Sequence, residues 1–191
     1  MALDSESRWR LVRAMRARGE QQPTSNEVTI RAAETEDLTQ ISEIYNYYIR
    51  NSVVTFDLEA MSLDEWQHKF EWIQSLKLPF VVAESAGGQI LGFAYVAPWR
   101  QKAAYRRTVE DSIYLRPAAI GKRVGTKLLS EIIDRSKASG VKEIVAVISD
   151  KGAESSIALH ESFGFKHQGH LAKVGFKFGR WLGTVLMQKS L

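Results

Sequence analysis

A carboxylate and a glycine-containing basic loop lie close together in this chain, at residues 110 and 120–125. Glu110 is part of TVEDSIYL (108–115), whose Val, Ile, Thr and Tyr residues alternate as in a β-strand. Pro117 ends that strand, because proline cannot continue a ladder. The loop that follows carries two glycines and two cations. A carboxylate can take a proton, and a loop of this kind can hold an anion, typically a phosphate.

A helix must follow the loop. From Thr126 the apolar residues fall on one helical face, at Leu128, Leu129, Ile132 and Ile133, and Gly140 supplies a stop. The N-terminus of such a helix presents unpaired backbone N–H groups and a positive dipole end. The strand, loop and helix together therefore predict an anion site.

Two interpretations of Glu110 are open from the residues alone. Strict alternation places Glu110 on one face of the strand and Asp111 on the other. A carboxylate on a central strand is costly unless it is solvated or functional. A solvent-exposed position near the end of the strand, with Glu110 paired to Arg106 or Arg107, explains this carboxylate as well as a catalytic role does.

The bulk composition narrows the class of protein. A chain of 191 residues fits one domain with a real core, and it has no apolar run of the roughly 20 residues that span a bilayer. It has no cysteine, which excludes disulfides, thiolate nucleophiles and cysteine-ligated zinc, and which fits a cytoplasmic location. The net charge of +4 suits an anionic ligand better than a nucleic-acid surface. We therefore expect neither a membrane nor a nucleic-acid partner, and no metal, although His167 and His170 have a loose metal spacing.

The element order predicts an α/β protein with a mixed sheet and helices on both faces. Residues 1–26 form an N-terminal extension, poorly ordered or a short basic helix, and residues 27–191 form the domain. We expect the order β-α-α-β-β-β-α-β-α-β-β. Thr35 is expected to cap the first helix, and Ser62 with Glu65 to form a capping box for the second.

This order and several phrases resemble the GCN5-related N-acetyltransferases (GNAT), in particular their phosphinothricin and methionine sulfoximine acetyltransferase branch. The resemblance covers residues 28 to the C-terminus and rests on six phrases in the right order: IYNYYI (44–49), VVTF (53–56), AYRRTVEDSIYL (104–115), VAVI (145–148), SIALHESFGF (156–165) and GFKFGRW (175–181). It implies the GNAT fold, a central and mostly antiparallel sheet, with acetyl-CoA as co-substrate and a homodimer.

The resemblance also assigns roles to the residues of the anion site. Glu110 matches the proposed general base. The family's Gln/Arg-x-x-Gly-x-Gly/Ala loop holds the coenzyme A pyrophosphate, but this chain has Ile120 and Arg123 at two of its positions, and only Gly125 matches. The implied coenzyme site comprises Ile113, Tyr114, Leu115, Ile120, Gly121, Lys122, Arg123, Val124, Gly125 and Thr126.

Further roles follow from the same resemblance. His160 alone is best explained as a half-buried histidine at the core, whereas in this branch a histidine donates a proton or hydrogen bond to the departing thiolate. The cations of WRQKAAYRR (99–107) are usually a solvated surface, whereas the branch uses this loop to hold a substrate carboxylate. Arg100 and Arg106 are the candidates, with Phe56 as an aromatic wall of the pocket.

The sequence thus indicates an acetyltransferase acting on a small amino acid-like acceptor, such as phosphinothricin or methionine sulfoximine. Direct transfer is expected, because no cysteine can form a covalent acyl intermediate. Two alternatives stay open. One is a non-catalytic acyl-CoA-binding or regulatory domain, and the other is an enzyme of the same fold that acts on protein N-termini or other amines.

Overall fold

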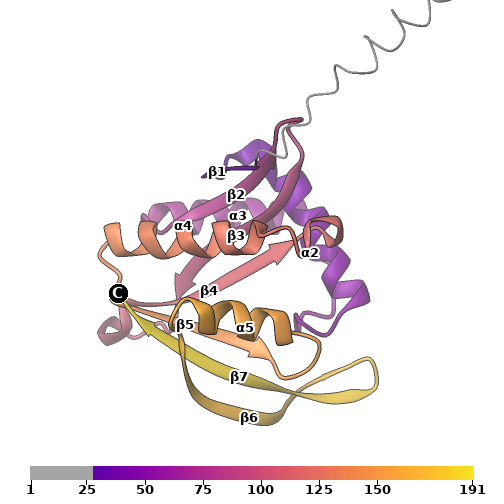
Figure 1. The fold of residues 1–191 in the computed structure, drawn as a ribbon, viewed down its shortest axis with the longest axis vertical. Helices are drawn as coiled ribbons and strands as arrows, with labels where there is room; N and C mark the ends of the chain where they lie inside the picture. Colours follow the sequence, from indigo (N-terminus) through magenta and orange to yellow (C-terminus); the bar gives the residue numbers. More distant parts are fainter. Residues whose placement is uncertain (1–27) are drawn as a thin grey trace, which may run out of the picture.

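One seven-stranded sheet runs through residues 28–191, the part of the chain that the computed structural model describes (Figure 1). Its strand order is β1-β2-β3-β4-β5-β7-β6. Within it β4 and β5 run parallel, and the other neighbouring pairs are antiparallel. The strands are β1 (Val28–Ala32), β2 (Phe80–Ser85), β3 (Ile90–Pro98), β4 (Thr108–Leu115), β5 (Glu143–Ser149), β6 (Lys166–Lys177) and β7 (Arg180–Ser190). The extension predicted at 1–26 lies outside the described residues.

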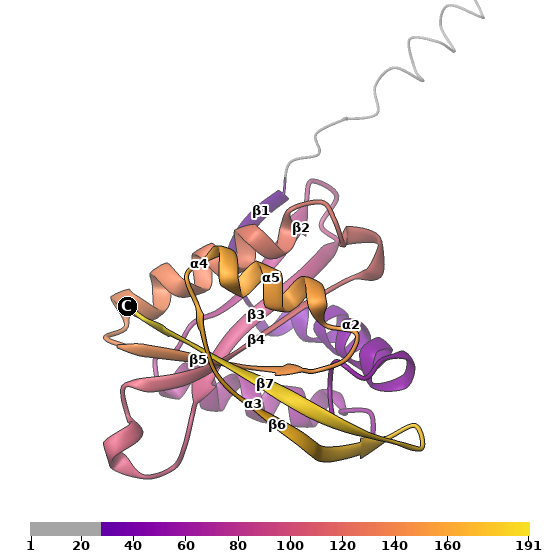
Figure 2. The same cartoon turned by 60° about the horizontal axis from the view of Figure 1, so that its bottom comes forward.

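Helices cover both faces of the sheet (Figure 2). On one face lie α2 (Leu38–Asn51) and α3 (Leu63–Ser75), and on the other α4 (Val124–Ala138) and α5 (Glu154–Ser162). Three short 3₁₀ helices, η1 (Thr35–Asp37), η2 (Ala103–Tyr105) and η3 (Pro117–Ala119), lie in the connections. The observed order of strands and α-helices is the predicted one.

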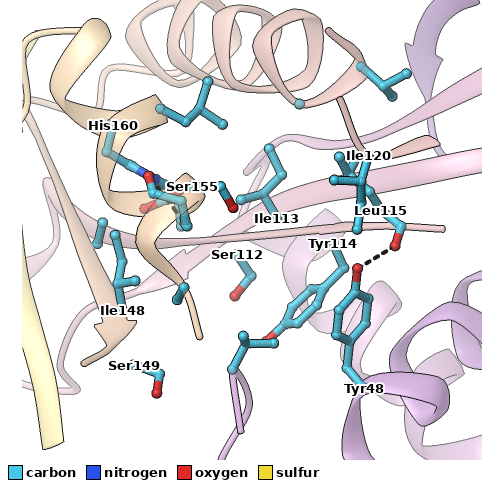
Figure 3. A pocket seen from close by; sticks show the side chains of 18 of the residues that line it. Tyr48, Ser112, Ile113, Tyr114, Leu115, Ile120, Ile148, Ser149, Ser155 and His160 are labelled. Carbon is cyan, nitrogen blue, oxygen red and sulfur yellow. Dashed lines mark hydrogen bonds and ion pairs between the residues drawn. The ribbon is translucent and has the colours of Figure 1, made fainter. Parts of the chain in front are cut away.

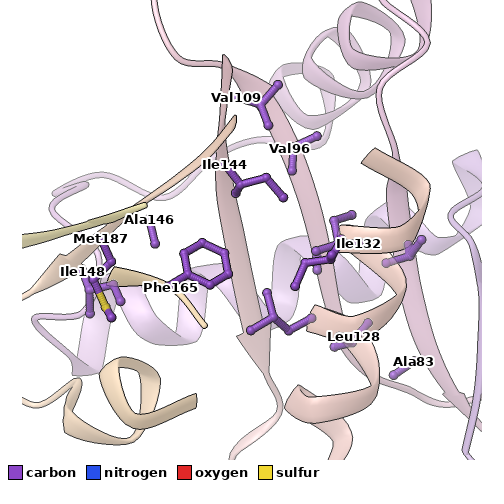
Figure 4. Packing of buried hydrophobic residues seen from close by; sticks show 14 of the residues in the cluster. Ala83, Val96, Val109, Leu128, Ile132, Ile144, Ala146, Ile148, Phe165 and Met187 are labelled. Carbon is purple, nitrogen blue, oxygen red and sulfur yellow. The ribbon is translucent and has the colours of Figure 1, made fainter. Parts of the chain in front are cut away.

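Strand alternation divides the buried side chains into two cores. Val81 and Ala83 of β2 face α4, whereas Phe80 and Val82 face α2 and α3. Figure 4 shows the α4 core, in which Leu128 and Ile132 pack with residues of the central strands. Each fully buried aliphatic side chain of this kind contributes roughly 1.5–3 kcal/mol. The two cores hold β4 rigidly between helical layers.

Helix starts show where local prediction succeeded and where it was wrong. The Ser62–Glu65 capping box is confirmed, since the Glu65 N–H donates to Ser62 Oγ at 3.3 Å and the Ser62 N–H to the Glu65 carboxylate at 2.7 Å. Thr35 is not a cap. Thr35 is already the first residue of η1, and Glu34 takes the cap position before it. The Glu34 N–H donates to the Asp37 carboxylate at 2.8 Å, so Asp37 rather than Thr35 supplies the side-chain oxygen at this turn.

Candidate active site

The central feature is an opening between β4 and β5. The two strands pair only over Thr108–Glu110 and Glu143–Val145 and then separate, while β4 stays paired with β3 as far as Leu115. A cavity of about 480 Å³ lies in this opening. Figure 3 shows its walls, with Ile113 and Leu115 from β4 and Ile148 from β5. Glu110 lies where the pairing of β4 with β5 stops, and we call the end of the cavity beside it the closed end.

Some backbone N–H and C=O groups of β4 face this cavity without a partner strand. The Trp99 N–H donates to the Thr108 carbonyl at 3.2 Å, and the Arg116 N–H donates to the Leu91 carbonyl at 2.7 Å. Partners alternate along an antiparallel strand, so the even-numbered residues of β4 face β3 and the odd-numbered ones face β5. Where β5 has moved away, the odd-numbered residues have no strand partner on that side.

Ile113 and Leu115 are the two residues concerned. The Leu115 carbonyl accepts a hydrogen bond from the Tyr48 hydroxyl of α2 at 2.7 Å (Figure 3). This leaves the N–H groups of both residues and the Ile113 carbonyl facing the cavity without a partner strand. Buried backbone groups are nearly always paired. An extended ligand with its own amides could therefore bind here as a strand does.

The predicted anion loop lies at the mouth of the same cavity. Its lining includes Ile120, Gly121 and Arg123, followed by Val124, Gly125 and Thr126 of the first turn of α4, whereas Lys122 is exposed and does not line it. The amides of that first turn precede the helical bond from the Lys127 N–H to the Arg123 carbonyl, so they have no acceptor one turn back. These amides, with the helix dipole, favour an anion.

Two residues of this loop have a left-handed backbone conformation, and one of them is not a glycine. Arg123 has φ of +60° and Gly121 has φ of +78°. A left-handed residue other than glycine costs about 1–2 kcal/mol, which explains the glycine that the family has in place of Arg123. Gly125, by contrast, lies within α4, and a Cβ there would meet Leu159 at 3.4 Å and Leu115 at 3.5 Å. These are ordinary contact distances, so Gly125 needs no special dihedral and leaves room for a Cβ but not for a larger side chain.

Glu110 lies at the closed end, half-buried and lining the cavity. Burial raises the pKa of its carboxyl, the negative charge of Asp111 adds to that rise, and the Lys69 ammonium opposes it. Among residues 28–191 no hydrogen bond or ion pair holds Glu110, so the expected alternative pairing with Arg106 or Arg107 is not observed. A free carboxylate with a raised pKa can accept a proton.

His160 lines the cavity from α5, and its imidazole is almost fully buried. Nε2 lies 2.9 Å from Asp111 Oδ2, and Nδ1 lies 2.7 Å from the Ser156 carbonyl oxygen. Burial lowers the pKa of this imidazole, but the hydrogen bond and charge of Asp111, with the Ser156 carbonyl, outweigh it, so the pKa is raised. Neither ring nitrogen is free. Sequence reasoning missed Asp111.

The predicted acceptor residues lie outside the cavity lining. Arg106 is exposed, and Arg100 is exposed with its guanidinium 5.1 Å from the Trp99 ring centroid. Phe56 packs against β6, where a Cβ on Gly175 would come within 2.5 Å of its ring. The structure thus groups Glu110, His160 and nine of the ten residues predicted to bind the coenzyme at one cavity, but not Arg100, Arg106 and Phe56.

Residues that the sequence did not single out complete the region. Tyr48, Ser112 and Ser149 line the cavity. Lys177 is 3% exposed, and its Nζ donates to the Thr55 carbonyl at 2.8 Å. Burial lowers the pKa of this ammonium, and the Asp57 charge partly restores it. Lys177, although buried, is not part of the cavity lining. For Tyr48 the phrase that contains it was the available signal, but no local pattern tells which residue of that phrase lines the cavity.

A family model described as an acetyltransferase (GNAT) domain matches residues 30–186. The chain belongs to this family. GNAT relatives include the phosphinothricin N-acetyltransferase of Alcaligenes faecalis, 39% identical over 163 residues (85% of this chain, 82% of the relative). The L-methionine sulfoximine/L-methionine sulfone acetyltransferase of Pseudomonas aeruginosa is 37% identical over 163 residues (85% and 94%).

A solved GNAT structure agrees with the fold. The phosphinothricin acetyltransferase of Sinorhizobium meliloti, in complex with AcCoA, superposes with a TM-score of 0.82 at 44% identity, covering 86% of this chain and 88% of that one. The predicted GNAT fold and acyltransferase class are confirmed. No helix in residues 28–191 is long and apolar enough to cross a membrane. Within the same residues no three or more His, Asp or Glu side chains gather as metal ligands would.

Proposed function

We propose that this enzyme transfers the acetyl group of acetyl-CoA directly to the amino group of a small amino acid-like acceptor, with Glu110 as general base. The observation that carries the proposal is the cavity between β4 and β5. This cavity is lined by unpaired strand amides, by a helix N-terminus and by a carboxyl group whose pKa is raised. The names of the relatives support the acetyl donor and the kind of acceptor.

The donor half of the site consists of Ile113, Tyr114, Leu115 and residues 120–126. The pantetheine arm of acetyl-CoA carries amides, and it would pair with the free backbone groups of Ile113 and Leu115. Its pyrophosphate would meet the first-turn amides of α4, with the charges of Lys122 and Arg123 nearby. The thioester would then lie at the closed end, beside Glu110 and His160.

The chemistry needs one base and one electrophile. Glu110 takes a proton from the acceptor ammonium, directly or through water, and the freed lone pair attacks the thioester carbonyl carbon. The new C–N bond forms, the C–S bond breaks, and sulfur leaves with its electron pair as a thiolate. The nitrogen gives up a second proton and the thiolate takes one. His160 would stabilise the departing thiolate, and its position in the cavity lining supports this role.

The acceptor half of the site consists of the opposite face of β4, with Glu110 and Ser112, and of Lys69 beside it. Phosphinothricin and methionine sulfoximine each carry an α-amino group and acidic or polar ends. We propose that a cation holds the carboxylate, with Arg106 and Arg100 as candidates and Phe56 as an apolar wall. An Arg fork can meet both carboxylate oxygens.

A homodimer is part of this proposal. The β6–β7 hairpin carries five large apolar side chains that are each roughly half exposed: Leu171, Val174, Phe176, Phe178 and Trp181. The rings of Phe176 and Trp181 pack edge to face at 5.4 Å between centroids. Exposed apolar groups on one hairpin favour a protein interface. Light scattering gives the mass directly, and a monomer at micromolar concentration would contradict this part.

The function is tested by following thiol release from acetyl-CoA with a panel of acceptors. We expect phosphinothricin, methionine sulfoximine and related amino acids to be acetylated, and their carboxyl amides much less. If acetyl-CoA binds but no amine releases thiol, the binding-domain alternative replaces the enzyme. Equal acetylation of an amide and its free acid would instead favour peptide N-termini as the acceptor.

A further inference from the structure

Asp111 is the one charged group within hydrogen-bond reach of His160 among the described residues. The two side chains are each 2% exposed and both line the cavity. Only one carboxylate oxygen of Asp111 is used, since Oδ2 meets Nε2 at 2.9 Å. The other, Oδ1, is buried and has no hydrogen-bond partner among residues 28–191. Unpaired buried oxygens of this kind are rare and need a reason.

The partners of the ring fix its protons. A backbone carbonyl can only accept, so Nδ1, at 2.7 Å from the Ser156 oxygen, must carry a hydrogen. Nε2 faces a carboxylate oxygen, which also only accepts, so Nε2 carries a hydrogen as well. The pair therefore contains an imidazolium and a carboxylate, with no net charge and no ring N–H left over.

Within residues 28–191, Asp111 is the one charged group that shifts the pKa of His160. The ring of Phe165, the residue just before β6, meets the imidazole edge to face at 4.9 Å between centroids. On the cavity side β5 contributes Ala146 and Ile148, neither of which titrates. Glu110, the next carboxylate on β4, projects from the opposite face of the strand. The charge state of His160 thus depends on Asp111.

We propose that Asp111 is a positioning residue for acetyl transfer. Through Oδ2 it holds His160 as an imidazolium at the closed end of the cavity, while its Oδ1 stays buried without a partner among residues 28–191. This inference rests on the proposed function for its catalytic consequence, but not for the pairing itself. With both N–H groups held, His160 acts on the leaving sulfur through its positive charge, which is fixed in place before the thiolate forms.

The pairing is tested on the ligand-free protein, without any assay of activity. Carbon-13 labelling of the histidine rings reports their protonation by NMR, and His160→Gln identifies the signal of residue 160 among the four histidines. We expect the wild-type ring to stay protonated above pH 6.5, and in Asp111→Asn to lose its proton well below that. If wild-type His160 titrates at or below 6.5, or if Asp111→Asn leaves the titration unchanged, the proposal is wrong.

The catalytic consequence is tested with a double-mutant cycle in kcat. Asp111→Asn should lower kcat by up to about a hundredfold, the scale of a misplaced catalytic group, with the Kd for acetyl-CoA within about twofold. If Asp111 acts through His160, the double variant should be no slower than His160→Gln alone. Independent, multiplicative losses would overturn the proposal.

A matched control lies on the same helix. Glu161 pairs with His167 at 2.8 Å, but both side chains are about half exposed. Glu161→Gln should change neither kcat nor the titration of His160. Thermal unfolding of each variant shows whether it folds. Should Asp111→Asn fail to fold, the wild-type titration still decides. A wild-type protein without transferase activity would overturn the proposed function, whereas the NMR result would stand.

Discussion

The proposed donor half and the proposed acceptor half of the site are built in different ways. The donor half uses backbone: free strand amides at Ile113 and Leu115, and the first turn of α4. The acceptor half uses side chains from β4 and α3, such as Glu110 and Lys69. A backbone site depends on dihedrals and close packing and tolerates changes of side chain. A side-chain site can lose its function through one substitution without losing its shape.

Glu110→Gln should have the largest effect, because it removes the base while keeping the size of the side chain. We expect kcat to fall roughly a hundred- to ten-thousandfold, with the Kd for acetyl-CoA nearly unchanged. In the wild type the pKa of Glu110 is raised, and only the deprotonated form accepts a proton. The rate should therefore rise with pH through that raised pKa, and the variant should lack this limb. A variant with a near-normal pH–rate profile would show that solvent takes the proton.

Arg106→Ala tests whether the acceptor half extends to the exposed loop before β4. A charge-assisted hydrogen bond is worth about 1.5–3 kcal/mol, so the acceptor KM should rise roughly ten- to a hundredfold with little change for acetyl-CoA. Arg107→Ala, the exposed neighbour, is the matched control. If the two variants behave alike, Arg106 is not the clamp, and Lys69, whose charge lowers the pKa of Glu110, becomes the next candidate.

Gly125→Val tests the packing of the donor half. A Cβ alone would fit at 3.4 Å from Leu159, but the two further methyl groups of valine would press on Leu159 and Leu115. Overpacking typically costs 1–3 kcal/mol, and displacement of the first turn should weaken acetyl-CoA binding about tenfold or more. Gly125→Ala is the control and should bind nearly normally. Calorimetric titration measures both, and equal affinities would contradict this account.

Arg123→Gly should have the smallest effect, with opposite signs on stability and binding. Glycine relieves about 1–2 kcal/mol of left-handed strain but costs roughly 0.5–1 kcal/mol in chain entropy, so we expect a gain between zero and about 1.5 kcal/mol. For a chain of this size each kcal/mol raises Tm by about 2–4 °C. Loss of the cation should weaken acetyl-CoA binding slightly at low salt. Lys122→Ala removes charge without altering a left-handed residue, so it should change affinity but not Tm.

The elements of the donor half could be predicted because their signals are local. Alternation and Pro117 gave the bounds of β4 as observed, and the loop and the helical stripe after it placed α4 within two residues. The family resemblance, rather than spacing, added the role of the loop. The left-handed residue was not foreseen, because Arg123 has no propensity that marks it.

The remaining parts depend on contacts between distant residues. Asp111 and His160 are 49 positions apart, and no pattern in either segment indicates that the two side chains meet. Lys177 reaches Thr55 across 122 positions for the same reason. Arg106 was chosen for its nearness to Glu110 in sequence. However, the turn after η2 leaves its side chain exposed and away from the cavity.

The short pairing of β4 with β5 also has a mechanical consequence. Three register pairs join the sheet of β1–β4 to the sheet of β5–β7, so the two parts are coupled mainly through the helices and their core. Local opening should begin at this seam, and the amides of Ile113 and Leu115 should exchange with solvent deuterium faster than those of Ser112 and Tyr114. A ligand that pairs with them would slow that exchange and make the two parts unfold as one.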